Sequence, residues 1–349
     1  MKNLSLLLIL AAVGTMGCFA QTNLVATLSH SSSIQEFYGA TALSEAYTAA
    51  ENGDVITLSA GTFNSITLEK SITLRGSGMC ETEDGAVEPT YLTGTFTINV
   101  PSETANYLTL ENLQFNNALN VYGDNLSPAT FSKCYFTNNV TCFGCNALFM
   151  SCFFYSYLIS RASVSTGQMT SIDKNTVVTC RNSVVKRPSC DGQHTEGMYA
   201  TPVSLATLEL DNCVVGTYSL SKTTLKNCII MNNSGITSIS ESATVTKCVA
   251  IDKNSDSQIF KYHPDGGNVI AESMEAVFQT LREMDFSREE HFLLTEEAAV
   301  KYLGTDGTQV GIYGGDMPYA PTPASPHVKK FNVKNTTEDG KLRVSLEVE

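Results

Sequence analysis

Residues 42–78 read ALSEAYTAAENGDVITLSAGTFNSITLEKSITLRGSG, and their pattern changes from one periodicity to another. The first part places Leu43, Ala46 and Ala50 on one face of a helix. After a break at Gly53, apolar residues alternate with small polar ones, which is typical of strands. The stretch therefore predicts a short helix followed by the first strands of a β structure.

A degenerate unit recurs from residue 107 onward: alternating apolar residues, a polar residue, then a central cysteine or small substitute, then further apolar residues. The central positions are Leu113, Cys134, Cys152, Ser183, Cys213, Cys228 and Cys248. Successive centres lie 21, 18, 31, 30, 15 and 20 residues apart, so each of the two longest intervals holds either two coils or one coil with a loop. This irregular spacing excludes a strict leucine-rich or ankyrin array and favours a solenoid whose turns vary in length.

These patterns resemble the pectate-lyase-like family of exported bacterial proteins. The resemblance is carried at the start of the chain by Ala46, Ala49 or Ala50, Gly53, Asp54, Ile56, Leu58, Gly61, Phe63, Ile66, Leu68, Ile72, Thr73, Leu74 and Gly76. A closing stretch is also similar, with Asp306, Gly307, Thr308, Gly311, Ile312, Gly314 and Gly315. The resemblance implies an all-β fold, a right-handed parallel β-helix (solenoid) with an N-terminal capping helix and a short C-terminal β tail.

Composition divides the chain into four parts. Residues 1–20 read as a signal peptide and residues 21–41 as an N-terminal lead-in. Residues 42–320 carry the parallel β-helix with its capping helix and closing stretch, and residues 321–349 carry a Pro-rich linker and a terminal β-hairpin. Apolar residues within 272–284 recur at helical spacing, so we expect a helix there, packed at or near the C-terminal end of the solenoid.

The N-terminal leader predicts export to the periplasm, the medium or the outer membrane. Its apolar run is too short to cross a bilayer stably, and no transmembrane span is expected after its removal. Cleavage after Ala20 is the favoured interpretation. Lipidation of Cys18 is the alternative, although Thr15 stands where a lipoprotein signal prefers an aliphatic residue.

Eleven cysteines in an exported chain first suggest a disulfide framework. Most of them, however, lie inside strand-like segments, one per coil. Equivalent side chains on neighbouring parallel strands lie about 4.8 Å apart and point the same way, whereas a disulfide needs Cβ atoms turned toward each other at about 3.8 Å. We therefore expect mainly reduced, buried thiols. The two pairs for which a disulfide stays an alternative are Cys142 with Cys145 and Cys180 with Cys190.

Asparagines recur beside the central positions and between units. They are Asn112, Asn182, Asn212 and Asn227, with the pairs Asn116-Asn117, Asn138-Asn139 and Asn232-Asn233. Asparagine tolerates the left-handed backbone of a tight corner, so a corner role is the favoured prediction. Contact with a sugar is the alternative.

The charge balance limits the partners. The chain has 35 acidic and 22 basic residues and a net charge of −13, which argues against a nucleic-acid partner, because binding to phosphate needs clustered positive charge. Reactive residues concentrate in the two longest intervals, where loops stand off the coils. The candidate ligand contacts are Arg161, Arg181, Lys186, Arg187, Asp191 and His194. Tyr155, Tyr157, Tyr199 and Tyr218 are either a sugar-stacking platform or packing residues.

Two functions follow as hypotheses. The first is an exported, non-catalytic β-helix protein whose lateral face binds a glycan or a surface protein. The second is a polysaccharide lyase or glycoside hydrolase that acts on an acidic polysaccharide near residues 161–196. No catalytic residue and no cofactor is assigned. Ca²⁺ bound by Asp252, Asp256 and Asp265 stays an open alternative. Candidate residues gathered in one cleft would favour the enzyme, and dispersed residues would favour the binding protein.

Overall fold

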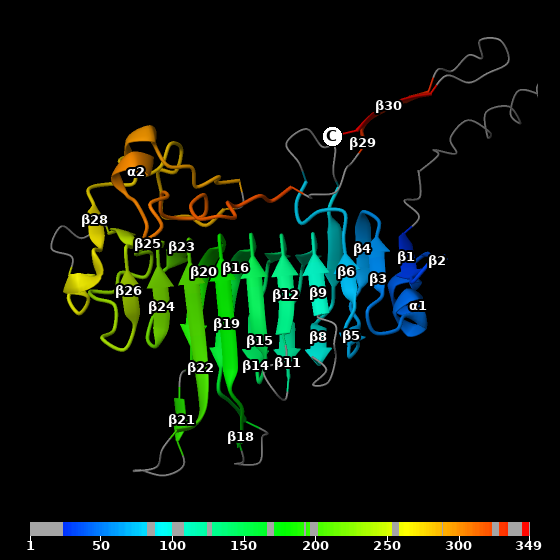
Figure 1. Ribbon diagram of the computed structural model, residues 1–349, viewed down its shortest axis with the longest axis horizontal. Helices are drawn as coiled ribbons and strands as arrows, with labels where there is room; N and C mark the ends of the chain where they lie inside the picture. Colours follow the sequence, from blue (N-terminus) through cyan, green and yellow to red (C-terminus); the bar gives the residue numbers. More distant parts are fainter. Residues whose placement is uncertain are drawn as a thin grey trace, which may run out of the picture.

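The chain forms an elongated, mostly β structure (Figure 1). The computed structural model describes residues 24–81, 88–99, 108–123, 128–165, 171–191, 193–195, 202–252, 258–287, 289–322, 328–333 and 344–348. Residues 1–20, which were predicted to be a signal peptide and include Cys18, lie outside the described residues.

Sheet 1 is a ladder of parallel strands, one from each coil. Its order is β3 (Val55–Leu58), β6 (Thr73–Arg75), β9 (Leu108–Glu111), β12 (Pro128–Ser132), β15 (Asn146–Met150), β19 (Thr176–Arg181), β22 (Pro202–Asp211), β24 (Thr223–Lys226) and β26 (Thr244–Thr246). Each strand pairs with the strand of the next coil in register, so Leu74 stands beside Leu110 and Leu110 beside Phe131. This stacking of like on like confirms the all-β parallel β-helix.

Sheet 2 forms the other wall. Its main path is β4 (Gly61–Asn64), β7 (Thr90–Thr93), β10 (Gln114–Phe115), β13 (Tyr135–Phe136), β16 (Phe153–Arg161), β20 (Val184–Cys190), β23 (Val214–Gly216), β25 (Ile229–Met231), β27 (Val249–Ile251) and β28 (Val269–Ala271). A second flank holds β5 (Thr67–Leu68), β8 (Phe96–Asn99), β11 (Leu119–Tyr122) and β14 (Val140–Phe143). The long strand β16 joins the flanks, because it pairs with β13 and also with β14.

The two longest sequence intervals are each a single coil with an inserted hairpin. β15 pairs directly with β19, and β19 pairs directly with β22, so no coil lies between them. The insertions form antiparallel pairs: β17 (Ser163–Ser165) with β18 (Ser171–Asp173), and β21 (Gln193–Thr195) with the start of β22. Both project from the lower side of the solenoid in Figure 1. Of the two readings left open by the spacing, one coil with a loop is confirmed.

The N-terminal end is closed by a helix and a hairpin. The predicted helix is α1 (Ala42–Ala49), and it buries Leu43 and Ala46 against the first coil. The lead-in also forms structure that the sequence reasoning missed. Strands β1 (Val25–His30) and β2 (Ser33–Tyr38) pair antiparallel, and β1 adds antiparallel to β3.

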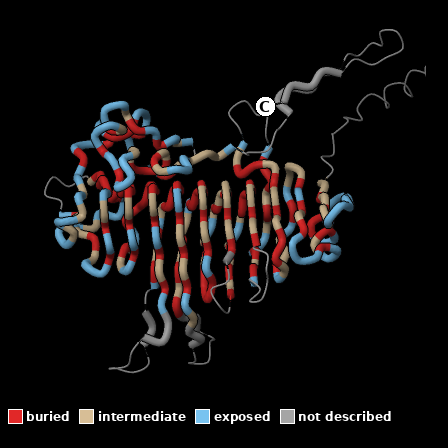
Figure 2. Tube along the Cα trace, viewed as in Figure 1, coloured by how far each residue is buried: buried red, intermediate tan, exposed pale blue. Residues whose placement is uncertain are grey.

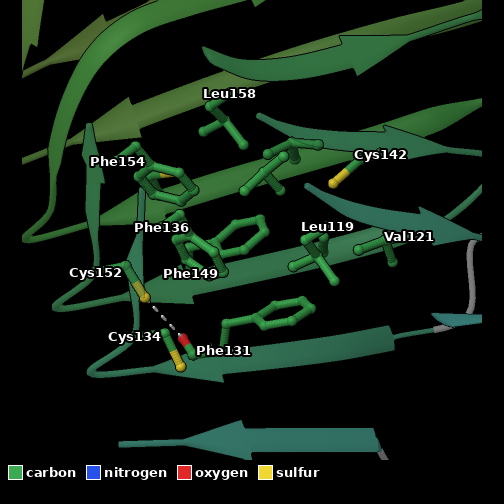
Figure 3. Close-up of a cluster of buried hydrophobic side chains, with 14 of the residues drawn as sticks. Leu119, Val121, Phe131, Cys134, Phe136, Cys142, Phe149, Cys152, Phe154 and Leu158 are labelled. Carbon is green, nitrogen blue, oxygen red and sulfur yellow. Dashed lines mark hydrogen bonds between the residues drawn. The ribbon is translucent and has the colours of Figure 1, made fainter. Parts of the chain in front are cut away.

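A column of aromatic rings fills the middle of the solenoid (Figure 3). Phe136 stacks on Phe115 and Phe154, with ring centroids 5.0 Å and 4.8 Å away. Phe131 stacks on Phe149 at 4.5 Å and meets Phe136 edge to face. These rings come from matching positions of successive coils, and Figure 2 shows the buried residues running along the interior of the whole ladder.

The cysteines of the repeating unit lie inside the solenoid at the corner between sheets 1 and 2. The central cysteines are buried, and the ten cysteines that the structure describes are free thiols. Their sulfurs donate to backbone carbonyls, as Cys152 Sγ does to Phe131 O at 3.6 Å (Figure 3). Burial raises the pKa of Cys134, Cys180 and Cys213, so these thiols stay neutral. The predicted placement as small buried apolar groups is confirmed.

The residue before each central position adopts the left-handed conformation. The φ angles are 57° at Asn112, 47° at Asn182, 51° at Asn212 and 55° at Asn227, as predicted for corners. Lysine or serine takes the same conformation in the other coils. The asparagine pairs are different and do not have positive φ. Asn117 and Asn233, for example, accept backbone N–H groups of the preceding coil, from Gly94 and Thr217.

The predicted helix over residues 272–284 is wrong. After one turn, in which Phe278 N donates to Met274 O, the chain extends and Phe278 forms a bridge with Leu294. The segment does lie near the C-terminal end of the coils, since residues 282–285 line one hollow with Asn232, Asn233 and Asp252, but it lies on the outer face of these coils and not across their end. Residues 272–322, here called the C-terminal strap, run back along the outer face of sheet 2 (Figure 1). The apolar positions of the helical pattern are buried in that contact, because a sheet face satisfies them as well as a helix would.

The strap contains one short helix, α2 (Glu296–Lys301), which the sequence reasoning did not predict. Thr295 caps its N-terminus by accepting from Ala298 N at 3.1 Å. Beyond the strap, β29 (Val328–Val333) and β30 (Val344–Val348) pair antiparallel and confirm the terminal hairpin. A 3₁₀ turn (Pro264–Gly266) lies near the C-terminal end of the coils.

The strap is fastened to the row of left-handed corners. Asn182 Nδ2 donates to Ile312 O at 3.0 Å and to Gly314 O at 2.7 Å. Asn227 Oδ1 accepts from Thr305 N at 2.8 Å, and Asn227 O accepts from Gly311 N. Gly311 has a φ of +82°, and a Cβ there would lie only 2.7 Å from Cδ1 of Ile229. The glycine-rich closing motif therefore seats the strap.

Removing the Asn182 amide is expected to loosen the strap. We expect Asn182→Gly, which keeps the left-handed backbone but loses two hydrogen bonds, to lower the free energy of unfolding by about 1–2 kcal/mol. Asn182→Ala should cost about 1–2 kcal/mol more, because alanine is strained at positive φ. Urea denaturation measures both.

The matched control for Asn182 is Asn112→Gly. Asn112 has the same backbone conformation, but its buried Oδ1 has no hydrogen-bond partner. We expect a smaller loss there than at Asn182. Equal losses at the two positions would show that the bonds to the strap do not stabilise the fold.

Candidate functional site

Three tyrosines lie on the outer face of sheet 2, where β16 and β20 join its two flanks. Tyr155 and Tyr157 come from β16, and Tyr218 follows β23. The side chains of Tyr155 and Tyr218 are 44% and 51% exposed, so packing does not account for them. Tyr157 meets Tyr218 edge to face, with ring centroids 4.9 Å apart. Of the two interpretations, surface platform or packing, exposure favours the platform. Tyr199 lies outside the described residues.

Two of the predicted basic residues hold these rings in place. Lys186 Nζ lies 4.0 Å from the centroid of the Tyr155 ring, and the Arg187 guanidinium lies 5.2 Å from that of Tyr157. Both cations come from β20, which pairs with β16 across the bulge between residues 154 and 157. Tyr155, Tyr157 and Tyr218 with Lys186 and Arg187 are here called the tyrosine belt.

Arg161 and Asp191 form an ion pair that links the two inserted hairpins. Arg161 Nε lies 2.6 Å from Asp191 Oδ2, at the points where the chain leaves β16 and β20 for the insertions. The two side chains are 37% and 41% exposed, and such a pair contributes at most about 1 kcal/mol. The ion pair holds the starting points of the two hairpins side by side, and neither charge is left unpaired.

The remaining two candidates do not join this group. Arg181 is exposed on sheet 1, where its Cα partners are Met150 and Asp211. His194 lies on β21 opposite Ser204, and its side chain is not described. The six predicted residues therefore lie in separate places: two in the belt, two in an ion pair, one on sheet 1 and one on a hairpin.

A shallow hollow adjoins the belt on the side of the first coils. It has a volume of about 370 Å³ and is here called the near hollow. Its lining residues are Gln114, Tyr135, Thr137, Tyr155, Asp285, Ser287 and Glu289. The first four lie on successive coils of sheet 2, and the last three belong to the strap. Two tyrosine rings, an amide and a hydroxyl of the coils thus face two carboxylates and a hydroxyl of the strap across the near hollow.

The strap side of the near hollow was missed from the sequence. Asp285 Oδ1 accepts from Phe286 N at 2.7 Å, and Glu289 Oε2 accepts from Ser287 Oγ at 2.6 Å, so these bonds orient both carboxylates. The acidic run near residues 283–290 was a visible signal. Its position beside Tyr135 and Tyr155 was not, because more than a hundred residues separate them in the chain.

In the described part of the chain, no group of three or more His, Cys, Asp or Glu side chains is placed to hold a metal ion. Of the three aspartates considered for Ca²⁺, Asp256 lies outside the described residues. No described helix has the length and apolar character needed to span a membrane.

Comparison with known proteins adds no relative. No family model matches the chain, and neither does any curated protein or any solved structure. The class of protein is therefore defined by the fold, a parallel β-helix with a C-terminal strap, and by the lateral tyrosine belt beside the near hollow.

Proposed function

We propose that this chain is an exported, non-catalytic β-helix protein that binds a glycan along its lateral face. The observation that carries the proposal is the tyrosine belt, with three rings on the outer face, two from β16 and one that follows β23, and two of them under a cation. Tyrosine offers an apolar face together with a hydroxyl, which matches the alternating C–H and O–H surfaces of a sugar. The pattern of residues 1–20 supports export.

The polar groups beside the belt support a glycan over a protein partner. The near hollow is lined mainly by hydroxyl, amide and carboxylate groups, which form hydrogen bonds with sugar hydroxyls. A stable protein interface needs a larger apolar centre. The main apolar outer face of sheet 2 is already covered by the strap.

Removing rings from the belt is expected to weaken binding. Tyr155→Ala and Tyr157→Ala should each reduce affinity for the bound glycan roughly tenfold, the size of effect that central aromatic contacts commonly have. Affinity is measured by titration calorimetry after a panel of soluble glycans has identified a ligand. Tyr155→Phe should keep most of the affinity, because the ring remains.

Tyr262→Ala is the matched control. Tyr262 is 47% exposed and has Lys261 over its ring, but it lies near the C-terminal end of the coils, away from the belt. It should bind as the unaltered protein does. Failure of every glycan in the panel to bind would overturn the proposal, and so would equal losses at Tyr262 and Tyr155.

The rival hypothesis, a lyase or hydrolase, is tested with the same panel. Unsaturated products or new reducing ends, abolished by Lys186→Ala or Arg187→Ala, would establish catalysis in place of simple binding. The dispersion of the six candidate residues favours the non-catalytic protein.

A further inference from the structure

A second hollow lies at the other end of the same strap loop. Its volume is about 680 Å³, and it is here called the far hollow. Its lining residues are Asn232, Asn233, Gly235, Asp252, Arg282, Glu283, Met284 and Asp285. Asp285 lines both hollows, so the two meet at this residue. The two hollows, here together called the groove, lie between the outer face of sheet 2 and the strap residues Arg282, Glu283, Met284, Asp285, Ser287 and Glu289.

The groove runs along the axis of the solenoid. Its coil side begins at Gln114 on β10 and ends at Asp252, which follows β27. Seven strands lie on this path, β10, β13, β16, β20, β23, β25 and β27, and residues of the two middle strands, β20 and β23, line neither hollow. At about 4.8 Å between neighbouring strands, the outer ends of the two hollows are on the order of 29 Å apart. That length suits an extended chain of several sugar units better than a single small molecule.

Negative charge dominates the lining of the groove. Asp252, Glu283, Asp285 and Glu289 contribute carboxylates. The single cation that lines either hollow, among the described residues, is Arg282.

The Arg282 guanidinium donates to the backbone carbonyls of Phe278, Gln279 and Leu281. Lys186 and Arg187 lie over the rings of Tyr155 and Tyr157 in the tyrosine belt and line neither hollow, so their charge acts at the belt and not at the strap wall. A uronic-acid chain would place repeated carboxylates against this wall, and such like-charge contacts oppose binding.

We infer that the groove selects an uncharged glycan chain and excludes acidic polysaccharides. The chain lies along the strap, with the near hollow and the tyrosine belt as one set of subsites and the far hollow as another. Strap carboxylates accept hydrogen bonds from sugar hydroxyls and repel uronates. This inference rests on the proposed function and specifies its ligand class.

The charge test uses the full mature chain and a variant with both near-hollow acids neutralised, Asp285→Asn with Glu289→Gln. Asparagine and glutamine keep an acceptor oxygen for Phe286 N and Ser287 Oγ, so the loop geometry is retained. Binding is measured at low salt to neutral hexasaccharides (cellohexaose, xylohexaose, mannohexaose) and to hexagalacturonate. We expect the unaltered protein to bind a neutral chain and not the uronate, and the variant to gain at least about tenfold in affinity for the uronate.

Glu209→Gln with Glu241→Gln is the matched control. It removes the same number of charges at two exposed positions outside both hollows. It should gain little uronate affinity. Preference of the unaltered protein for hexagalacturonate would overturn the inference, as would equal gains in the two double variants.

Chain length tests the far hollow separately. Glu283 is exposed and lines only the far hollow. We expect Glu283→Ala to weaken binding of the neutral hexasaccharide several-fold and to leave a neutral disaccharide unaffected, whereas Tyr155→Ala weakens both. Equal effects of Glu283→Ala on both lengths would remove the far hollow from the site.

The outcomes for the inference and for the proposed function can be told apart. If the protein binds uronate and belt variants weaken that binding, the proposed function stands and only the inferred ligand class fails. If no glycan binds, both fail.

Discussion

Replacing Phe136 with alanine is expected to lower the free energy of unfolding by about 3–5 kcal/mol, the usual cost of removing a buried phenylalanine ring. Phe136 is 1% exposed and touches four other rings. The vacancy would interrupt the aromatic column between the coils of Phe115 and Phe154. Because these coils contact only their neighbours, the interior cannot collapse from the sides to refill it.

The measurement is urea denaturation followed by fluorescence and circular dichroism. Phe136→Leu should cost less than about 2 kcal/mol, because leucine fills much of the space. Val300→Ala serves as the control, since Val300 is 77% exposed on α2 and its loss should be close to zero. A cost below about 1 kcal/mol for Phe136→Ala would contradict the close packing of the column (Figure 3).

Replacing Phe278 with alanine is expected to release part of the strap. Phe278 is 1% exposed, and its ring meets that of Phe292, which in turn meets Phe153 on the outer face of sheet 2. Removal of its ring should lower the free energy that holds the strap on sheet 2 by about 3–5 kcal/mol. Because the strap lies outside the solenoid, we expect this loss to appear first as local opening and not as global unfolding.

Limited proteolysis and hydrogen exchange distinguish the two outcomes. In Phe278→Ala, cleavage and exchange should increase within residues 272–322, while the amides of β12 and β15 stay protected. The variant should also bind an apolar dye, since Phe153, Val184 and Val214 would become exposed. Simultaneous loss of protection in strap and coils would show instead that they unfold as one unit.

Local residue patterns predicted much of the solenoid. The recurring central cysteine, the preceding asparagine and the alternating apolar residues each have a direct physical cause. A thiol is small enough for a crowded corner, asparagine tolerates positive φ, and alternation buries one face of a strand. The lead-in hairpin was missed, although the alternation in residues 25–30 was a visible signal.

The strap was predicted incorrectly for a reason that lies outside its own residues. Met274, Val277, Phe278 and Leu281 do mark a buried face, and helical spacing was the usual interpretation. The outer face of sheet 2, however, offered a long apolar row of Phe153, Val184, Val214, Ile229 and Val249. Covering that row required an extended path, so tertiary contact overrode the local preference.

The candidate site was predicted in part. Lys186 and Arg187 do lie on an exposed lateral face, but they lie over Tyr155 and Tyr157, and Arg161 pairs with Asp191. The concentration of basic residues in the sequence suggested an acidic ligand. The fold places carboxylates of the strap beside the same face, and the charge of the groove is reversed.

By itself, the sequence determined the succession of coils, their corners and their dry interior, because these depend on residues close together in the chain and on a repeat that stacks like on like. Only the tertiary structure decided what covers the outside. The strap returns over coils folded from earlier parts of the chain, as far back as Phe153, and the groove exists only where the two meet. A surface assembled from such distant segments leaves no local pattern, since neither segment contains the complementary half.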